Sequence, residues 1–195
     1  IFSVFKGYDT KSVSLTKESA AVFLWKKGEA MFKEGDFIIY GSNGVCQVEH
    51  IGSMDLQGVP GDKMYYTLVP VYEEKSRLFT PVDNHKVVMR PVISKKEACE
   101  LIDHMQEMQV FEIQNEKNRD TVFKEALKTG DCEELVRVIK TIYEKKQERK
   151  AQGKKVTAGD ERYFKLAEEH LYGELAIALG IEKDKVSSYI EKRIA

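Results

Sequence analysis

Short runs of alternating apolar and polar residues occupy the chain from Phe32 to Val92. Aromatic and β-branched residues dominate these runs, and clusters of Gly, Pro, Asn and Asp separate them, which is typical of strands joined by tight turns. Five short strands in about sixty residues predict a small β-barrel of the SH3-like or Tudor-like kind. The strands are expected at 37–40, 45–51, 64–69, 77–80 and 86–89.

The spacing of apolar positions becomes helical after Ser94. Ser94 followed three residues later by Glu97 is a capping box, and Asp131 and Thr157 precede further helical patterns in the same way. The third helix is expected to fade in the charged run 143–153. The helices are therefore expected over 94–108, 116–128, 131 to that run, 157–180 and 183–194.

These two patterns predict an α+β protein of two domains, namely the small barrel over 31–92 and an all-helical bundle over 93–195. The first thirty residues keep neither pattern, although the strand pattern begins at once at Met31. We interpret residues 1–30 as a non-native leader, or as upstream sequence read in frame, and exclude them from the fold. A genuine N-terminal extension is the alternative.

The overall composition is that of a globular protein. The 195 residues carry 31 Lys and Arg against 32 Asp and Glu, a net charge of −1, and 42% of them are apolar. No run approaches the roughly 18 apolar residues of a membrane-spanning helix. Cys46, Cys99 and Cys132 are odd in number and widely spaced, which favours reduced thiols in a cytoplasmic protein over a disulfide framework.

Residues suited to catalysis or metal binding are scattered. The four histidines form no His-x-x-x-His pair, and the three cysteines form no Cys-x-x-Cys pair. Cys46 lies inside an apolar strand, where a free cysteine is expected to be a core residue. We therefore predict no enzyme, no metal site and no cofactor. The alternative is an enzyme that uses Cys46 or a histidine–carboxylate pair.

Charge is concentrated locally. The strand half carries 6 basic and 8 acidic residues, a charge of −2, whereas residues 137–165 carry ten basic and four acidic residues, a charge of +6. Concentrated Lys and Arg bind phosphates electrostatically, mostly through the backbone of a nucleic acid. A solvated helix and loop is the alternative interpretation of this stretch.

Several short motifs follow one another in order along both halves. The strand half contains MFKEGDFIIY at 31–40, NGV at 43–45, VEHI at 48–51, YYTL at 65–68 and TPVDN at 80–84. The helical half contains LKTGD at 127–131, QER at 147–149, TAGDER at 157–162 and GELA at 173–176. This ordered set, which covers essentially all of 31–182, resembles the CarD family of bacterial transcription regulators.

The resemblance implies a function. In that family the barrel docks on the β subunit of RNA polymerase, and the bundle lies against promoter DNA at the upstream edge of the melted bubble, where it slows collapse of the open complex. The chain is thus expected to be a cytoplasmic bacterial regulator, and we expect a monomer that has no membrane partner. A polymerase- or protein-binding adaptor without direct DNA contact is the alternative.

The resemblance also implies two sets of contact residues. Those expected to bind RNA polymerase are Met54, Leu56, Arg77, Phe79 and Thr80. Those expected to bind DNA are Arg119, Lys140, Lys145, Arg149 and Arg162.

Three positions depart from the family pattern. Glu116 stands where family members commonly carry a tryptophan wedge, so weaker or differently arranged stabilisation of the fork is expected. Met54 and Phe79 occupy places where some relatives carry arginines. The contact with polymerase is therefore expected to be more apolar here.

Overall fold

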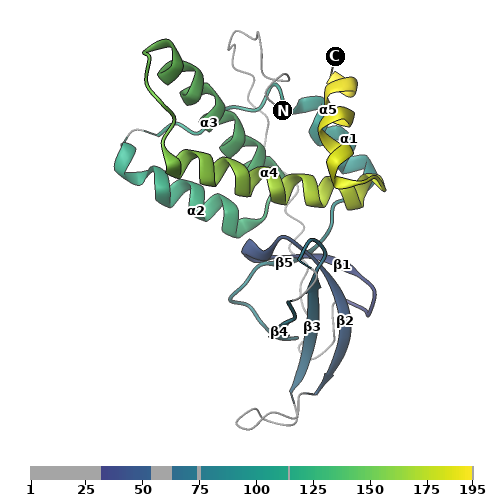
Figure 1. Ribbon diagram of the computed structural model, residues 1–195. Helices are drawn as coiled ribbons and strands as arrows, with labels where there is room; N and C mark the ends of the chain where they lie inside the picture. The colour runs from purple at the N-terminus through teal and green to yellow at the C-terminus, as the bar shows by residue number, and fades with distance from the viewer. Residues whose placement is uncertain (1–31, 54–62, 74–75, 114, 195) are drawn as a thin grey trace. The chain divides into compact units, whose positions relative to one another are not determined.

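The computed structural model describes residues 32–53, 63–73, 76–113 and 115–194 (Figure 1). These residues form one antiparallel sheet and five α-helices, which confirms the predicted α+β class. They divide into two compact units between Pro91 and Val92. The expected leader 1–30 and the expected contact residues Met54 and Leu56 lie outside the described residues.

The first unit is a five-stranded sheet with the order β4-β3-β2-β1-β5. Strands β1 to β4 follow one another as a meander, and β5 returns to pair with β1, so β4 and β5 are the two edges. The strand bounds are β1 (Phe37–Tyr40), β2 (Val45–Ser53), β3 (Met64–Pro70), β4 (Leu78–Pro81) and β5 (Met89–Pro91).

One face of this sheet is apolar because side chains alternate along each strand. Ile38, Val48 and Leu68 point into a common core and are essentially inaccessible to solvent. Tyr66 also lies in this core, and its hydroxyl accepts a hydrogen bond from the backbone N–H of Phe32 at 3.2 Å. The buried phenol is therefore satisfied, and it holds the start of the described chain against the sheet.

The last strand begins three residues later than the sequence predicts. The Asn84 side-chain oxygen accepts from the backbone N–H of Lys86 at 2.8 Å, which turns the chain away from a sheet ladder at this point. The carbonyl of Val88 instead accepts from the N–H of Gly41 at 2.9 Å, outside the strand pairing. Regular pairing with β1 starts only at Met89.

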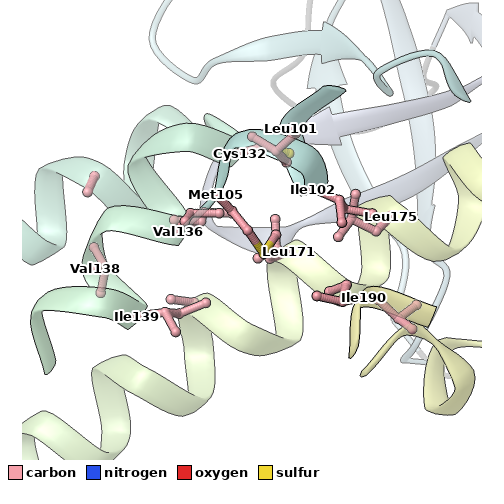
Figure 2. Close-up of a cluster of buried hydrophobic side chains, with 14 of the residues drawn as sticks. Leu101, Ile102, Met105, Cys132, Val136, Val138, Ile139, Leu171, Leu175 and Ile190 are labelled. Carbon is pink, nitrogen blue, oxygen red and sulfur yellow. The ribbon is translucent and has the colours of Figure 1, made fainter. Parts of the chain in front are cut away.

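The second unit contains all the helices. They are α1 (Lys95–His104), α2 (Arg119–Thr129), α3 (Cys132–Ala151), α4 (Ala158–Leu179) and α5 (Val186–Ile194), with short 3-10 turns at Glu116–Asn118 and Lys183–Lys185. Helix α4 packs against each of the other four (Figure 1). Figure 2 shows their apolar side chains converging on one core, among them Leu101, Ile102, Met105, Val136, Ile139, Leu171, Leu175 and Ile190.

Side chains cap three of these helices where the sequence places caps. The Ser94 hydroxyl accepts from the N–H of Glu97 at 3.2 Å, and the Glu97 carboxylate accepts in return from the N–H of Ser94 at 2.7 Å. Asp131 accepts from two N–H groups of the first turn of α3, and Thr157 accepts from the N–H of Asp160. These bonds satisfy N–H groups that have no partner inside a helix.

Two helix ends differ from the prediction. Helix α1 stops at His104, because the N–H of Met105 bonds the carbonyl of Ile102 in a tighter turn. Helix α3 continues through the charged run to Ala151, where Gly153 ends it in a left-handed conformation with φ +68°. Packing of α3 on α4, together with basic residues in its last turn, favours these extra turns.

The link between the units is short. Strand β5 ends at Pro91, and the backbone N–H of Ile93 already donates to the carboxylate of Glu174 on α4 at 3.0 Å. Glu174 is only 1% exposed, and its other oxygen accepts from the Cys132 thiol at 3.1 Å. Val92 is therefore the single residue between the last strand and the first anchored position of the helical unit.

Candidate functional site

Among the described strands, β4 pairs with β3 alone, so no described strand lies along its other edge. The N–H of Val82 just beyond it donates to the carbonyl of Met64 at 3.0 Å. Because ladder bonds alternate along an antiparallel pair, the backbone N–H and C=O of Phe79 point to the open side. An edge of this kind can accept a strand from another protein.

Two of the residues expected to bind polymerase lie at this edge. The side chain of Phe79 is 51% exposed although it is aromatic. Arg77, just before β4, donates to both oxygens of Glu49 at 2.6 and 2.7 Å. Glu49 lies where the register of β2 shifts against β3, and the hydrogen bond from Arg77 holds the pKa of its carboxyl below its usual value. The exposed ring of Phe79 therefore lies near the guanidinium of Arg77, which its two hydrogen bonds to Glu49 hold in a fixed orientation.

Thr80 does not lie on this surface. Its side chain is 1% exposed and accepts a hydrogen bond from the Asn84 amide at 2.7 Å. Neighbouring residues of a strand point to opposite faces, so Phe79 and Thr80 cannot both face outward. Thr80 stabilises the turn after β4 and is not placed to touch a partner with its side chain.

Three of the five expected DNA-binding residues are engaged within the helical unit. Arg119 lies between Glu116, at 2.9 Å, and the buried Asp160 of α4, at 3.3 Å. Lys145 of α3 bonds the other oxygen of Glu116, and this bond lowers the pKa of the Glu116 carboxyl. At the place where the resemblance implies a wedge, an acidic side chain thus joins the start of α2 to α3.

Lys140 has a similar internal role. Its ammonium group donates to the backbone carbonyls of Gln106 and Met108, both at 2.6 Å. These carbonyls belong to the segment that follows α1, and burial lowers the pKa of the Lys140 ammonium. Lys140 therefore fastens this segment to α3.

Arg149 is half-buried and Arg162 is exposed. Arg149 is near the end of α3, and its Nε donates to the backbone carbonyl of Lys155 at 2.8 Å, which leaves its terminal nitrogens to other partners. Arg162 lies in the second turn of α4, exposed, with its guanidinium 5.2 Å from the centre of the Tyr163 ring. These two arginines mark the basic end of the helical unit, where α3 ends and α4 begins.

Four lysines that share this end are missing from the expected DNA-binding set. Lys146 and Lys150 are four residues apart on α3, and Lys154 and Lys155 follow in the loop before α4. The spacing of the first two is a signal in the sequence, since residues four apart share a helix face. All four lie in the basic stretch 137–165, which the sequence already marks as suited to phosphates, although the set implied by the resemblance leaves them out.

The described residues offer little for catalysis. Burial raises the pKa of the Cys46 thiol to about 12, so this thiol stays protonated at neutral pH and is a poor nucleophile. In the described part of the chain, no three His, Cys, Asp or Glu side chains are grouped so as to hold a metal ion. Nor does any described helix have the length and apolar character needed to cross a bilayer.

These features define a class: a binding protein made of a small antiparallel sheet with an open, partly apolar edge and a helical unit with a basic end. Residues 32–93 match the CarD-like/TRCF RID domain, and residues 100–191 match the CarD C-terminal domain. The chain belongs to the CarD family, whose members are RNA polymerase-interacting transcription factors and whose first domain is Tudor-like.

Proposed function

We propose that this protein regulates initiation of transcription by docking on the β subunit of RNA polymerase through the open edge of β4 and by contacting promoter DNA through the basic end of the helical unit. The observation that carries the polymerase contact is the exposed ring of Phe79 on a strand that has only one strand beside it in the described part of the chain. Main-chain bonds along such an edge supply affinity, and the side chains beside it supply specificity.

The proposed action changes an equilibrium and makes or breaks no covalent bond. A protein that binds the open promoter complex better than the closed one increases the open population by the ratio of its two affinities. A preference of about 1.4 kcal/mol already changes this balance tenfold. The protein is proposed to act as a cytoplasmic monomer, with polymerase and promoter DNA as its partners.

Binding of the full chain to the β subunit tests the docking. We expect the Arg77→Ala, Phe79→Ala double variant to weaken this binding by about tenfold or more, because an exposed aromatic anchor and its neighbouring arginine are typical of residues that dominate an interface. The measurement is calorimetric titration of the purified β subunit with each chain.

The matched control is Val88→Ala, which trims an exposed apolar side chain that lies outside β4. It should bind as tightly as the wild type. If the double variant is folded by circular dichroism and binds like the control, the β4 edge is not the docking surface.

We narrow the DNA-binding set that the family resemblance implies. We retain Arg149 and Arg162 in the proposed DNA-binding set, because the internal bond of Arg149 uses only its Nε and Arg162 is exposed. We leave out Arg119, Lys140 and Lys145, because acceptors within the helical unit hold them. The adaptor that never touches DNA is the second candidate, and it is favoured by the internal use of these three cations. The salt dependence of promoter affinity distinguishes it from the regulator.

A further inference from the structure

Glu116 lies in the short 3-10 turn just before α2, and its carboxylate joins two helices. One oxygen accepts a hydrogen bond from the guanidinium of Arg119 at 2.9 Å, and the other accepts one from the ammonium of Lys145 on α3. The hydrogen bond from Lys145 lowers the pKa of the Glu116 carboxyl, and the charges of Lys145, Arg119 and Arg149 lower it further. The carboxylate is therefore ionised at neutral pH, and basic side chains surround it.

The acidic group of this cluster is more exposed than the lysine that it binds. The side chain of Glu116 is 66% exposed, whereas that of Lys145 is only 21% exposed. Among the described residues, only Glu116 accepts a hydrogen bond from the Lys145 ammonium. A phosphate that approaches Lys145 from solvent therefore meets a negative charge first, and it has to displace the carboxylate before the ammonium can bind it.

Arg119 is not released together with Lys145. Its second terminal nitrogen lies 3.3 Å from the carboxylate of Asp160 on α4, a residue that is 1% exposed. A buried charge that loses its partner is costly, so Arg119 stays with Asp160 when Glu116 moves away. Lys145 is thus the cation that displacement of Glu116 makes available.

Lys145 is placed beside a residue of the proposed DNA-binding set. It precedes Arg149 by four residues on α3, so the two side chains share a face of the helix, about 6 Å apart along its axis. The carboxylate that holds Lys145 is largely exposed, and ion pairs of this kind are weak. Phosphates of a DNA backbone that is bound at Arg149 can therefore compete with Glu116 for the ammonium.

We propose that Glu116 is an internal competitor of DNA phosphates for Lys145, and that it lowers the affinity of the helical unit for DNA by keeping this lysine occupied. The inference rests on the proposed contact between the basic end and promoter DNA. Lys145 is then engaged only by DNA that is bound closely enough to displace the acid. A purely structural role of Glu116, as a negative charge before the first turn of α2, instead predicts lower stability on its removal and unchanged DNA binding.

Binding of a labelled random-sequence DNA duplex to the full chain, measured by fluorescence anisotropy over a range of salt concentrations, tests the competition. At about 0.1 M salt, Glu116→Gln should bind about threefold tighter than the wild type, because it frees Lys145 and removes a charge that repels phosphate. Its plot of log affinity against log salt should be steeper by about 0.9, the contribution of one more neutralised phosphate. In a Lys145→Met background the same substitution should leave the slope unchanged.

The matched control is Glu125→Gln on α2. Glu125 is similarly exposed and pairs with Lys128 at 2.9 Å, but it lies about 14 Å from Glu116 along the chain axis, beyond the screening length of about 10 Å at this salt concentration. The control should stay within about twofold of the wild type and keep its slope. Equal gains in the two variants, or a steeper slope that persists in the Lys145→Met background, would overturn the proposal.

The proposed DNA contact fails on a different result. If Arg149→Ala, Arg162→Ala weakens DNA binding while a folded Glu116→Gln does not strengthen it, the contact stands and Glu116 is only structural. If neither variant changes DNA binding, both the contact and the competition are refuted. Far-ultraviolet circular dichroism checks that each variant is folded.

Discussion

Three polar or charged residues, Thr80, Asp160 and Glu174, are buried among the described residues. Each lies beside a turn, a helix start or a backbone N–H group outside regular secondary structure. Glu174 accepts a hydrogen bond from the N–H of Ile93. Asp160 accepts one from the hydroxyl of the helix cap Thr157 at 2.6 Å, and the Thr80 hydroxyl accepts one from the side-chain amide of Asn84. Buried polar groups are costly unless they are bonded, so these residues fix local geometry and are sensitive to substitution.

Glu174→Ala is expected to lower the free energy of unfolding by about 1–3 kcal/mol, because the N–H of Ile93 and the thiol of Cys132 lose their acceptor. Glu174→Gln keeps one acceptor oxygen and should lose less. Urea unfolding followed by far-ultraviolet circular dichroism measures both. Equal stability of the alanine variant and the wild type would show that the carboxylate does not anchor Ile93.

His170 on α4 is expected to make the protein less stable in mild acid. Its Nδ1 is buried without a hydrogen-bond partner in the described structure, and burial holds its pKa below 6.5, with Glu169 opposing and Lys183 reinforcing this shift. As the pH falls, the unfolded chain therefore binds a proton at His170 before the folded chain does. The contribution of neutral His170 to the free energy of unfolding is complete above pH 6.5 and is lost as the pH falls through the pKa of the folded state.

The measurement is the free energy of unfolding between about pH 7 and about pH 5.5, a window above the titration of most carboxylates. His170→Gln should show a shallower decline than the wild type. Identical slopes would mean that other groups cause the acid sensitivity.

At the scale of elements, single basic side chains fasten helices to one another and to the irregular segment after α1. Lys140 holds the segment after α1 through two carbonyls, and Arg119 joins α2 to α4 through Asp160. Arg193 of α5 likewise bonds both oxygens of Asp103 on α1, at 2.6 and 2.7 Å. Several basic side chains in this unit are therefore structural.

Lys140→Met should lower the free energy of unfolding by about 1–3 kcal/mol, because two carbonyls lose a charged donor. Amide hydrogen exchange in residues 105–113 should become faster than in the wild type. Unchanged exchange there, together with weaker promoter binding, would return Lys140 to the DNA-binding set that the sequence suggested.

Within the helical unit, trypsin is expected to cut first after Lys154 or Lys155. These residues lie in the loop between α3 and α4, whereas Lys146 and Lys150 are protected by helical hydrogen bonds. Mass spectrometry of early fragments locates the cut. Early cleavage after Lys146 would mean that α3 ends where the sequence pattern first suggested.

Local signals in the sequence predicted the elements whose bonds are themselves local. The Ser94–Glu97 box is of this kind. Strands β1 and β3 were predicted from their residue types and the turn residues beside them, although their pairing partners lie far away in the sequence. The end of α3 depends on its packing against α4, and the start of β5 depends on the Asn84 turn, so neither could be derived from hydrophobic spacing. For the candidate contacts, strand alternation alone should have separated the exposed Phe79 from the buried Thr80.

At the scale of the whole molecule, the salt dependence of promoter binding separates the regulator from the adaptor. With polymerase present, the logarithm of promoter affinity should fall linearly with the logarithm of salt concentration. An Arg149→Ala, Arg162→Ala variant should reduce that slope by about 0.9 for each phosphate that it no longer neutralises. The control Lys96→Ala, Lys128→Ala removes two exposed cations from α1 and α2 and should leave the slope unchanged. An unchanged slope in the arginine variant favours the adaptor.

The short link at Val92 has a kinetic consequence. Proline fixes the backbone just before it, and Ile93 is anchored just after it, so the two units are tethered by very little rotatable chain. When two tethered binding surfaces engage one target together, a surface that is released stays close to its binding site because the other surface is still bound. Its effective concentration at that site is therefore high, and it rebinds quickly. Two individually weak contacts then dissociate as slowly as one strong contact. A long dwell time on a promoter complex would therefore be set by the connection as much as by either surface.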